Sequence, residues 1–216
     1  DIKAIAKFAK QNGIIHIINN AYGVQCPEIM KMIRQAIDAG RVDAIIQSTD
    51  KNFLTPVGGA VILSPTSEKA EAIGKTYAGR ATAGPILQLL IALLSMGREK
   101  YNTLITLQQQ NRAELETQLQ ILAKERGEQI IDSRNPVSCA MTLSKLSQDH
   151  LSQLSGILYN LRVTGPRVVN PNESKFGTCT DDALPPYIVM NAAIGITQED
   201  VIESVSRLRK ALSQLS

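Results

Sequence analysis

Along the first part of the chain, segments whose apolar residues have helical spacing alternate with short apolar runs typical of strands. Ile2, Ile5 and Ala9 recur at helical spacing, and Gly13 marks the end of that helix. The continuous apolar run at residues 14–18 predicts a buried strand that ends in two asparagines. A helix at 28–39 and short strands at 42–47 and 60–63 are predicted after it. This alternation predicts an α/β fold with a parallel sheet.

Three strands are too few for a self-sufficient sheet of this kind. Residues 86–96 predict a helix that is apolar nearly all round, which is typical of a helix buried in a larger body. We therefore expect residues 14–18, 42–47 and 86–96 either to be covered by other polypeptide or to expose a large apolar face. Because the chain starts with Asp1 inside a helical pattern, we also expect it to be a fragment.

A different pattern follows Gly97. Residues 99–126 predict one long amphipathic helix, with leucines at helical spacing. Beyond it we expect strands at 128–131, 138–143, 167–169 and 187–191 and helices at 148–161 and 198–215, which together form a small α+β domain. The predicted domains are residues 1–97 and residues 98–216. The polar, glycine- and proline-containing stretch 172–186 is the expected loop.

Composition narrows the class of protein. The 216 residues are 44% hydrophobic, and no apolar stretch is long enough to cross a bilayer, so we expect a cytoplasmic globular protein. Cys26, Cys139 and Cys179 are odd in number and widely spaced, which favours buried or incidental thiols over a disulfide framework or a metal site. A net charge of +3 is too small for a general nucleic-acid footprint, so any RNA contact must be local.

Lys51 is the first candidate for chemistry. In the segment QSTDKNF it lies just after a predicted strand, among small hydroxyl residues. The amine of a lysine in such a place can form a Schiff base with an aldehyde cofactor, and Ser48 could hydrogen-bond the cofactor's phosphate. The local pattern alone favours an ordinary surface lysine.

Asn19 and Asn20 end the first predicted strand in the segment HIINNAYG. Open α/β sheets bind ligands at the carboxyl ends of their strands, so both are candidate ligand contacts. The alternative is an ordinary turn. His16, inside the apolar run, is interpreted as a hydrogen-bonded core histidine.

Arg80 precedes a predicted helix start in the segment YAGRATAGP. An arginine beside free backbone N–H groups suits a phosphate or a carboxylate. A solvated loop arginine is the alternative.

Five segments in order, HIINNAYGVQ, QSTDKNF with PVGGA, YAGRATAGP, NPVSCAMTL and VTGPRVV, resemble the O-phosphoseryl-tRNA:selenocysteinyl-tRNA synthase family, also called the soluble liver antigen family. The resemblance implies a fold-type-I pyridoxal-phosphate (PLP) transferase, of which this chain would be the C-terminal part of the large cofactor domain plus the small C-terminal domain. It implies that Lys51 holds PLP covalently, that Asn19 lies at the pyridine ring and that Arg80 binds the substrate phosphate. It does not match well at Arg162, which is displaced by one position from a family arginine that contacts tRNA.

The resemblance also implies the partners. The substrate would be phosphoserine-charged selenocysteine tRNA, the selenium donor selenophosphate, and the enzyme a homo-oligomer, a tetramer built as a dimer of dimers. Arg162, Arg207 and Lys210 are the candidate tRNA contacts, with a solvated helix face as the alternative for the last two. Two other functions stay open: another fold-type-I PLP lyase or desulfurase, or a non-catalytic tRNA or protein interaction fragment. Asp50 before the lysine and Asn19 argue against the desulfurases, which typically have histidine and aspartate there.

Overall fold

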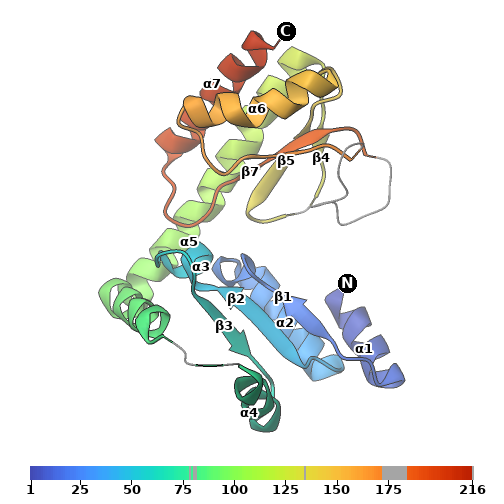
Figure 1. The fold of residues 1–216 in the computed structure, drawn as a ribbon, viewed down its shortest axis with the longest axis vertical. Coiled ribbons are helices and arrows are strands. Elements are labelled where there is room, and N and C mark those ends of the chain that lie inside the picture. The colour runs from blue at the N-terminus through green and yellow to red at the C-terminus, as the bar shows by residue number, and fades with distance from the viewer. Residues whose placement is uncertain (78, 80–81, 134, 172–183, 216) are drawn as a thin grey trace. The chain divides into compact units, whose positions relative to one another are not determined.

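A computed structural model describes residues 1–77, 79, 82–133, 135–171 and 184–215 (Figure 1). The chain divides into two compact units, Asp1–Ile105 and Thr106–Ser216. The division falls inside one helix, a little beyond the predicted boundary at residues 97 and 98. The described residues contain no helix that is both long and apolar enough to cross a membrane.

Unit 1 is built on a three-stranded sheet in the order β1-β2-β3. Its elements before the long helix are α1 (Ile2–Asn12), β1 (Ile17–Asn19), the 3-10 turn η1 (Gly23–Gln25), α2 (Pro27–Ala39), β2 (Ala44–Ser48), α3 (Thr49–Phe53), β3 (Ala60–Leu63) and α4 (Ser67–Thr76). β1 and β2 are parallel, as predicted. The prediction of a parallel sheet was wrong for β3, which pairs antiparallel with β2. The segment between β2 and β3 is too short for the crossover that a parallel strand needs.

Two helices pack together against this sheet (Figure 1). Asp1 caps α1 by accepting from the N–H groups of Lys3 and Ala4, and Gly13 ends it in the left-handed conformation. The small residues Ala6 and Ala36 bring α1 and α2 close, and Ile33 faces Ile18 and Ile45 of the sheet in one buried cluster. Burial of these apolar surfaces fixes the positions of β1 and β2.

The long helix α5 (Gly84–Arg126) contains a break at Gly97, with φ 63° and ψ 178°. The predicted helices at 86–96 and 99–126 are therefore correct, and so is the stop between them. A glycine is needed here because a side chain would disfavour this backbone conformation.

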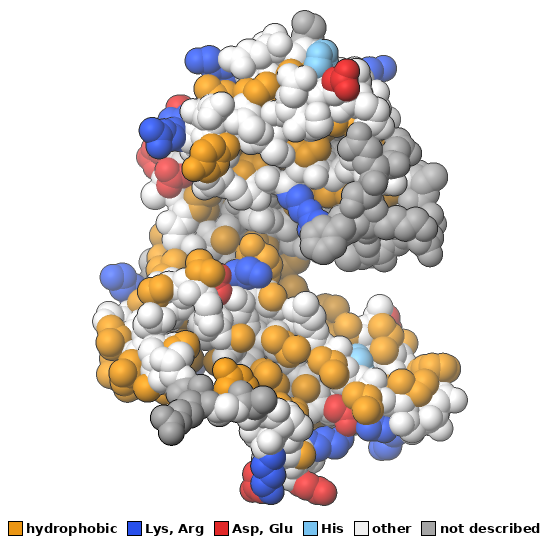
Figure 2. Space-filling model, viewed as in Figure 1, with side chains coloured by type: hydrophobic (Ala, Val, Ile, Leu, Met, Phe, Trp, Pro, Cys, Tyr) orange, Lys and Arg blue, Asp and Glu red, His pale blue; other side chains and the backbone are white. Residues whose placement is uncertain are grey.

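The expected apolar face is present in two of the three segments named. Large side chains of residues 14, 15 and 17 and most of those between residues 86 and 94 are exposed, and Figure 2 shows many hydrophobic side chains on the visible face of unit 1. The expectation was wrong for residues 42–47, because Val42, Ala44 and Ile45 are buried by the chain itself.

Unit 2 is an antiparallel sheet in the order β4-β5-β7-β6, covered by helices. Its elements after α5 are β4 (Ile130–Ile131), β5 (Ser138–Thr142), α6 (Gln148–Asn160), β6 (Arg167–Val169), β7 (Tyr187–Asn191) and α7 (Gln198–Gln214). Leucines of the second part of α5, of α6 and of α7 share one core with the sheet. The predicted small α+β domain is confirmed in its elements, while the predicted loop 172–186 and Cys179 fall mostly or wholly outside the described residues. Cys26 and Cys139 are buried, as expected of structural thiols.

Candidate functional site

The carboxyl ends of β1 and β2 place the candidate residues along one edge of the sheet. The two strands run parallel with Asn19 beside Ile46, so the chain leaves β1 at Asn19 and β2 at Ser48 on the same side. Lys51 follows β2 directly, as predicted, and lies within the short helix α3. Lys51, Ser48 and Asn19 are thus brought to the edge where ligands bind in sheets of this type.

The turn that carries Lys51 is held by its backbone and by buried amides. The side-chain amide of Asn52 donates to the carbonyl oxygens of Ala21 and Ser48, each at 2.7 Å. The amide of Gln25 donates to the Lys51 carbonyl at 2.9 Å, and the Gln25 N–H donates to Asn52 Oδ1 at 3.3 Å. Because both amides are buried and bonded, they lock α3 onto the segment after β1.

The Lys51 side chain is half-buried and has an aromatic neighbour. Its Nζ lies 4.8 Å from the centroid of the Tyr22 ring. Within the described part of the chain, Nζ has no hydrogen bond and no ion pair. The nearby Asp50 carboxylate accepts instead from the Ser48 hydroxyl. The amine is therefore held near the sheet edge without being neutralised by a carboxylate.

The environment of Tyr22 keeps its phenol neutral. Burial, and then the negative charge of Asp50, raise the pKa of Tyr22 above its ordinary value. Near pH 7 the side chain next to Lys51 is a protonated phenol.

Asn19 and Asn20 take different roles. Asn19 is exposed at the strand end, and its Oδ1 accepts from the Ala21 N–H at 3.2 Å, so the turn interpretation is correct for it without excluding a ligand. Asn20 is buried, its N–H donates to Ile46 O, and its amide points at Met30, so it belongs to the core. Gly23 fits against it because a Cβ there would lie 2.0 Å from Asn20 Oδ1.

His16 is hydrogen-bonded, as predicted, but it is only partly buried just before β1 and is not a core residue. Its ring Nδ1 lies 2.8 Å from the Arg41 carbonyl oxygen, and its backbone N–H donates to the Asp43 carboxylate at 2.9 Å. Asp43 also binds Arg41 and Lys69, and these partners lower its pKa below the ordinary value. This cluster lies at the amino ends of β1 and β2, away from Lys51.

Arg80 lies outside the described residues, so its assignment stays a prediction. The three residues predicted to contact tRNA are in unit 2. Arg162 follows α6 with φ 63°, and it lines a pocket of about 360 Å³ with Tyr159, Asn160 and Thr164. Arg207 is paired with Glu203 at 2.8 Å, whereas Lys210 is exposed on α7.

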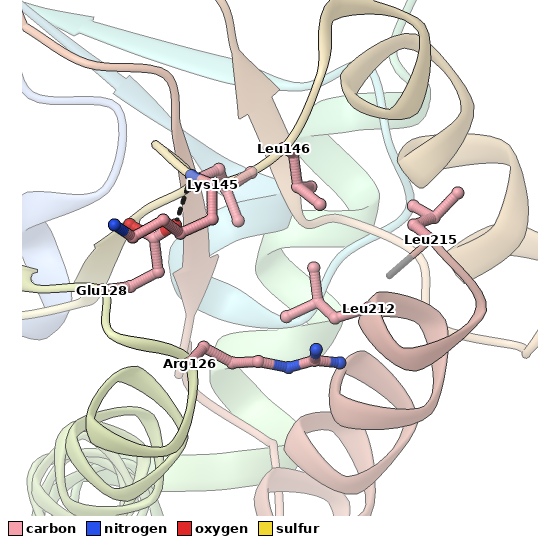
Figure 3. Close-up of a pocket in the computed structure, with 7 residues that line it drawn as sticks. Arg126, Glu128, Lys145, Leu146, Leu212 and Leu215 are labelled. Atoms are coloured by element: carbon pink, nitrogen blue, oxygen red, sulfur yellow. Dashed lines mark hydrogen bonds between the residues drawn. The ribbon is translucent and has the colours of Figure 1, made fainter.

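A second pocket in unit 2, of about 220 Å³, is lined by four leucines and three charged residues (Figure 3). It is lined by Arg126, Glu128, Leu143, Lys145, Leu146, Leu212 and Leu215. The Glu128 carboxylate already accepts from the hydroxyls of Thr142 and Ser144 and from the Lys145 N–H. No group of three potential metal ligands is found among the described residues.

The sequence interpretation missed Tyr22, Gln25 and Asn52 as site residues. Tyr22 is part of the segment HIINNAYG and Asn52 directly follows Lys51, so their positions were available as signals. Their roles depend on contacts between segments more than twenty residues apart, which no local pattern contains.

Comparison with known proteins agrees over nearly the whole chain. The family profile described as O-phosphoseryl-tRNA(Sec) selenium transferase, SepSecS, matches residues 1–213. Proteins of that name from Methanocaldococcus jannaschii and Dictyostelium discoideum are 41% and 35% identical over 98% and 97% of this chain. The chain covers 48% and 50% of these relatives, so it spans about half of their length.

Solved structures agree in fold. The crystal structure of an archaeal O-phosphoseryl-tRNA(Sec) selenium transferase matches with a TM-score of 0.87 and 38% identity, over 97% of this chain and 47% of that one. A cysteine desulfurase of Escherichia coli matches with a TM-score of 0.69 at 18% identity, over all of this chain and 56% of that one, which supports the shared fold alone. The fold is therefore that of fold-type-I PLP enzymes, and the chain belongs to the O-phosphoseryl-tRNA(Sec) selenium transferase family.

Proposed function

We propose that the intact protein converts O-phosphoseryl-tRNA(Sec) to selenocysteinyl-tRNA(Sec), with PLP as cofactor and selenophosphate as selenium donor. One observation carries the proposal. The chain matches this family over residues 1–213, and its Lys51 lies at the carboxyl ends of β1 and β2, where its amine has no ion pair with any described residue. The reaction removes phosphate by β-elimination and then adds selenium.

The residues at this edge fit the cofactor. An aldehyde cofactor with a phosphate and a pyridine ring needs an amine, a hydroxyl or N–H donor and a polar partner for the ring nitrogen. Lys51 and Asn19 supply the amine and the polar partner along one sheet edge. The Ser48 hydroxyl would supply the donor after turning away from the Asp50 carboxylate, to which it now donates. When bound, PLP supplies an electron sink for the carbon that loses its proton.

Three residues of this chain would have different roles in the reaction. Nζ of Lys51, as an amine without an ion pair among the described residues, would take the proton from the substrate α-carbon. Asn19 would contact the ring nitrogen as a neutral amide, a weaker aid than aspartate but sufficient for loss of a good leaving group. Arg80 would hold the departing phosphate and balance its charge.

Unit 2 would contribute to tRNA binding. Tyr159, Asn160, Arg162 and Thr164 combine an aromatic ring, a guanidinium and hydrogen-bonding groups around one pocket, the chemistry that binds unstacked bases. Lys210 would add a phosphate contact, and Arg207 would do so only after releasing Glu203. The exposed apolar residues of unit 1 support a homo-oligomer, which we propose is a tetramer that acts on a tRNA substrate in the cytoplasm.

Reduction with borohydride tests the lysine assignment. The intact protein is loaded with PLP, reduced and digested, and the labelled peptide is identified by mass spectrometry. We expect a pyridoxyl group on Lys51 and none on Lys69, which is paired with Asp43. A label on any other lysine contradicts the assignment.

Turnover tests the substrate. Wild-type protein should form selenocysteinyl-tRNA from phosphoseryl-tRNA and selenophosphate, and Lys51→Ala should not. Arg80→Ala should lose about 2–5 kcal/mol of transition-state stabilisation while keeping the absorbance of bound PLP, because a charge-assisted contact is removed. Unchanged turnover in Arg80→Ala would count against its phosphate role.

A further inference from the structure

The contact between Tyr22 and Lys51 joins two segments that the fold holds rigidly. Tyr22 lies between β1 and η1, and Lys51 lies in α3. Both backbone polar groups of Ala21, the residue before Tyr22, are bonded: its N–H donates to the Asn19 side chain and its carbonyl oxygen accepts from the Asn52 side chain. The residue after Tyr22, Gly23, has no room for a side chain. The backbone on both sides of Tyr22 is therefore fixed, which sets the position from which its ring extends.

The lysine, by contrast, has a flexible four-carbon stem. Such an amine samples many rotamers unless a neighbour restrains it. The face of the Tyr22 ring, 4.8 Å from Nζ, attracts an ammonium because the ring carries negative charge density on its face. Burial and Asp50 raise the pKa of Tyr22, so the ring acts as a neutral aromatic surface and not as a phenolate.

We propose that Tyr22 is a positioning residue for Lys51. The Tyr22 ring holds the Lys51 amine near the carboxyl ends of β1 and β2 and accommodates the positive charge that Nζ gains on taking a proton. This inference rests on the proposed function. In that step the α-C–H bond breaks, the proton and Nζ form an N–H bond, and the electron pair stays with the substrate. The neutral amine becomes an ammonium beside the ring, so the ring favours the charge as it develops.

The placement is tested in the protein without cofactor. Lysines are converted to ¹³C-dimethyl-lysine, and the Lys51 signal is assigned with Lys51→Arg. Methyl groups over an aromatic face are shifted upfield, so the Lys51 signal should lie upfield of the other lysines in wild-type protein and in Tyr22→Phe. In Tyr22→Leu this shift should vanish, while Phe8→Leu, which removes another ring from unit 1 that is 58% exposed, should leave it unchanged. An unshifted Lys51 signal in wild-type protein overturns the placement.

The role is tested in the PLP-loaded intact enzyme. Tyr22→Leu should lower kcat for phosphoseryl-tRNA by roughly three- to tenfold and leave KM unchanged, because a partly exposed cation–π contact has this order of strength. Tyr22→Phe keeps the ring and should restore most of the loss. If kcat is unchanged in Tyr22→Leu, or falls equally in Tyr22→Phe, the ring has no such role.

The two proposals fail in different ways. If the pyridoxyl group maps to another lysine, the assignment of Lys51 fails, and the role of Tyr22 with it. If Lys51 carries the label while Tyr22→Leu changes neither the methyl signal nor kcat, only the inference about Tyr22 is wrong.

Discussion

The ring of Tyr101 on α5 stacks on the ring of Phe53, the last residue of α3, with centroids 5.6 Å apart and an angle of 24° between planes. The contact ties the turn that carries Lys51 to the long helix. The Tyr101 hydroxyl is buried and has no hydrogen-bond partner among the described residues. Burial raises the pKa of Tyr101, so the hydroxyl stays protonated.

Two substitutions of Tyr101 should distinguish the contribution of its ring to stability from that of its hydroxyl. Tyr101→Leu should lower the free energy of unfolding by about 1–3 kcal/mol, because the stacked ring and its buried area are lost. Tyr101→Phe should leave stability unchanged or raise it by up to about 1 kcal/mol, because an unpaired buried hydroxyl is removed. Urea denaturation of the two variants measures both values. A clear loss in Tyr101→Phe would reveal a partner for the hydroxyl.

Asp43 organises the opposite edge of the sheet. Its carboxylate accepts from Arg41 Nε at 2.8 Å, from Lys69 Nζ at 2.5 Å and from the His16 N–H at 2.9 Å. Asp43→Asn removes the charge and should destabilise the protein by about 2 kcal/mol at pH 7. The matched control is Asp38→Asn, in an exposed pair with Arg34, which should cost less than about 0.5 kcal/mol. Equal effects of the two substitutions would contradict a special role for Asp43.

The same carboxylate makes stability depend on pH in a defined direction. Hydrogen bonds from Arg41, together with Lys69 and the His16 N–H, lower the folded-state pKa of Asp43 below its unfolded value of about 3.9. The unfolded chain therefore binds the proton first, so this contribution is complete above about pH 4 and declines as pH falls below it. Unfolding measured between pH 2 and 7 should show the difference between wild type and Asp43→Asn shrinking below pH 4. A constant difference would exclude this linkage.

Two glycines of unit 1 should respond oppositely to alanine. A Cβ at Gly40 would lie 2.2 Å from the backbone of Ala6, so Gly40→Ala must push α1 from α2 and should cost about 3 kcal/mol. Gly74 lies inside α4 with open space around it, so Gly74→Ala should stabilise by about 0.5–1 kcal/mol. Thermal and urea unfolding measure both. A tolerated Gly40→Ala would mean that α1 and α2 separate easily.

Gln108 should be essential to unit 2 although it is polar. It is 1% exposed, and its amide donates to the carbonyl oxygens of Pro136 at 3.0 Å and of Ala192 at 2.8 Å. Gln108→Leu leaves two backbone acceptors without their donor and should cost about 2 kcal/mol. Its neighbour Gln109 is exposed, so Gln109→Leu should change stability by less than about 0.5 kcal/mol. Urea denaturation compares the two, and similar losses would show that helix hydrophobicity, not the amide, controls the effect.

Local patterns were sufficient where periodicity and end signals agree. The helix over 27–39, the strands over 60–63 and 187–191 and the break at Gly97 follow from apolar spacing and glycine positions. α4 was missed because none of its side chains is buried, so it carries only a weak apolar stripe. The direction of β3 was wrong because pairing depends on the length and path of the connection, which an apolar run of four residues does not contain.

The site was predictable only in part for a related reason. Lys51, Ser48 and Asn19 could be named because the ends of strands are visible in sequence and because five segments resemble one family. The amides of Gln25 and Asn52 could not, since their partners are backbone carbonyls of other segments. Arg80 could be named from its place before a predicted helix start, but its role as the phosphate-binding residue depends on the resemblance.

The buried amides of Gln25 and Asn52 that hold α3 have a practical consequence for determining a structure with bound substrate. Among the described residues, the hydrogen bonds that hold this turn come from the backbone and from the side chains of Gln25, Asn52 and Ser48, and none comes from the Lys51 amine. The amine can therefore be deleted without unravelling the turn that carried it. Lys51→Ala should crystallise in the wild-type arrangement and retain a bound phosphoseryl-tRNA mimic that it cannot consume, which makes it the variant of choice for imaging the substrate in place.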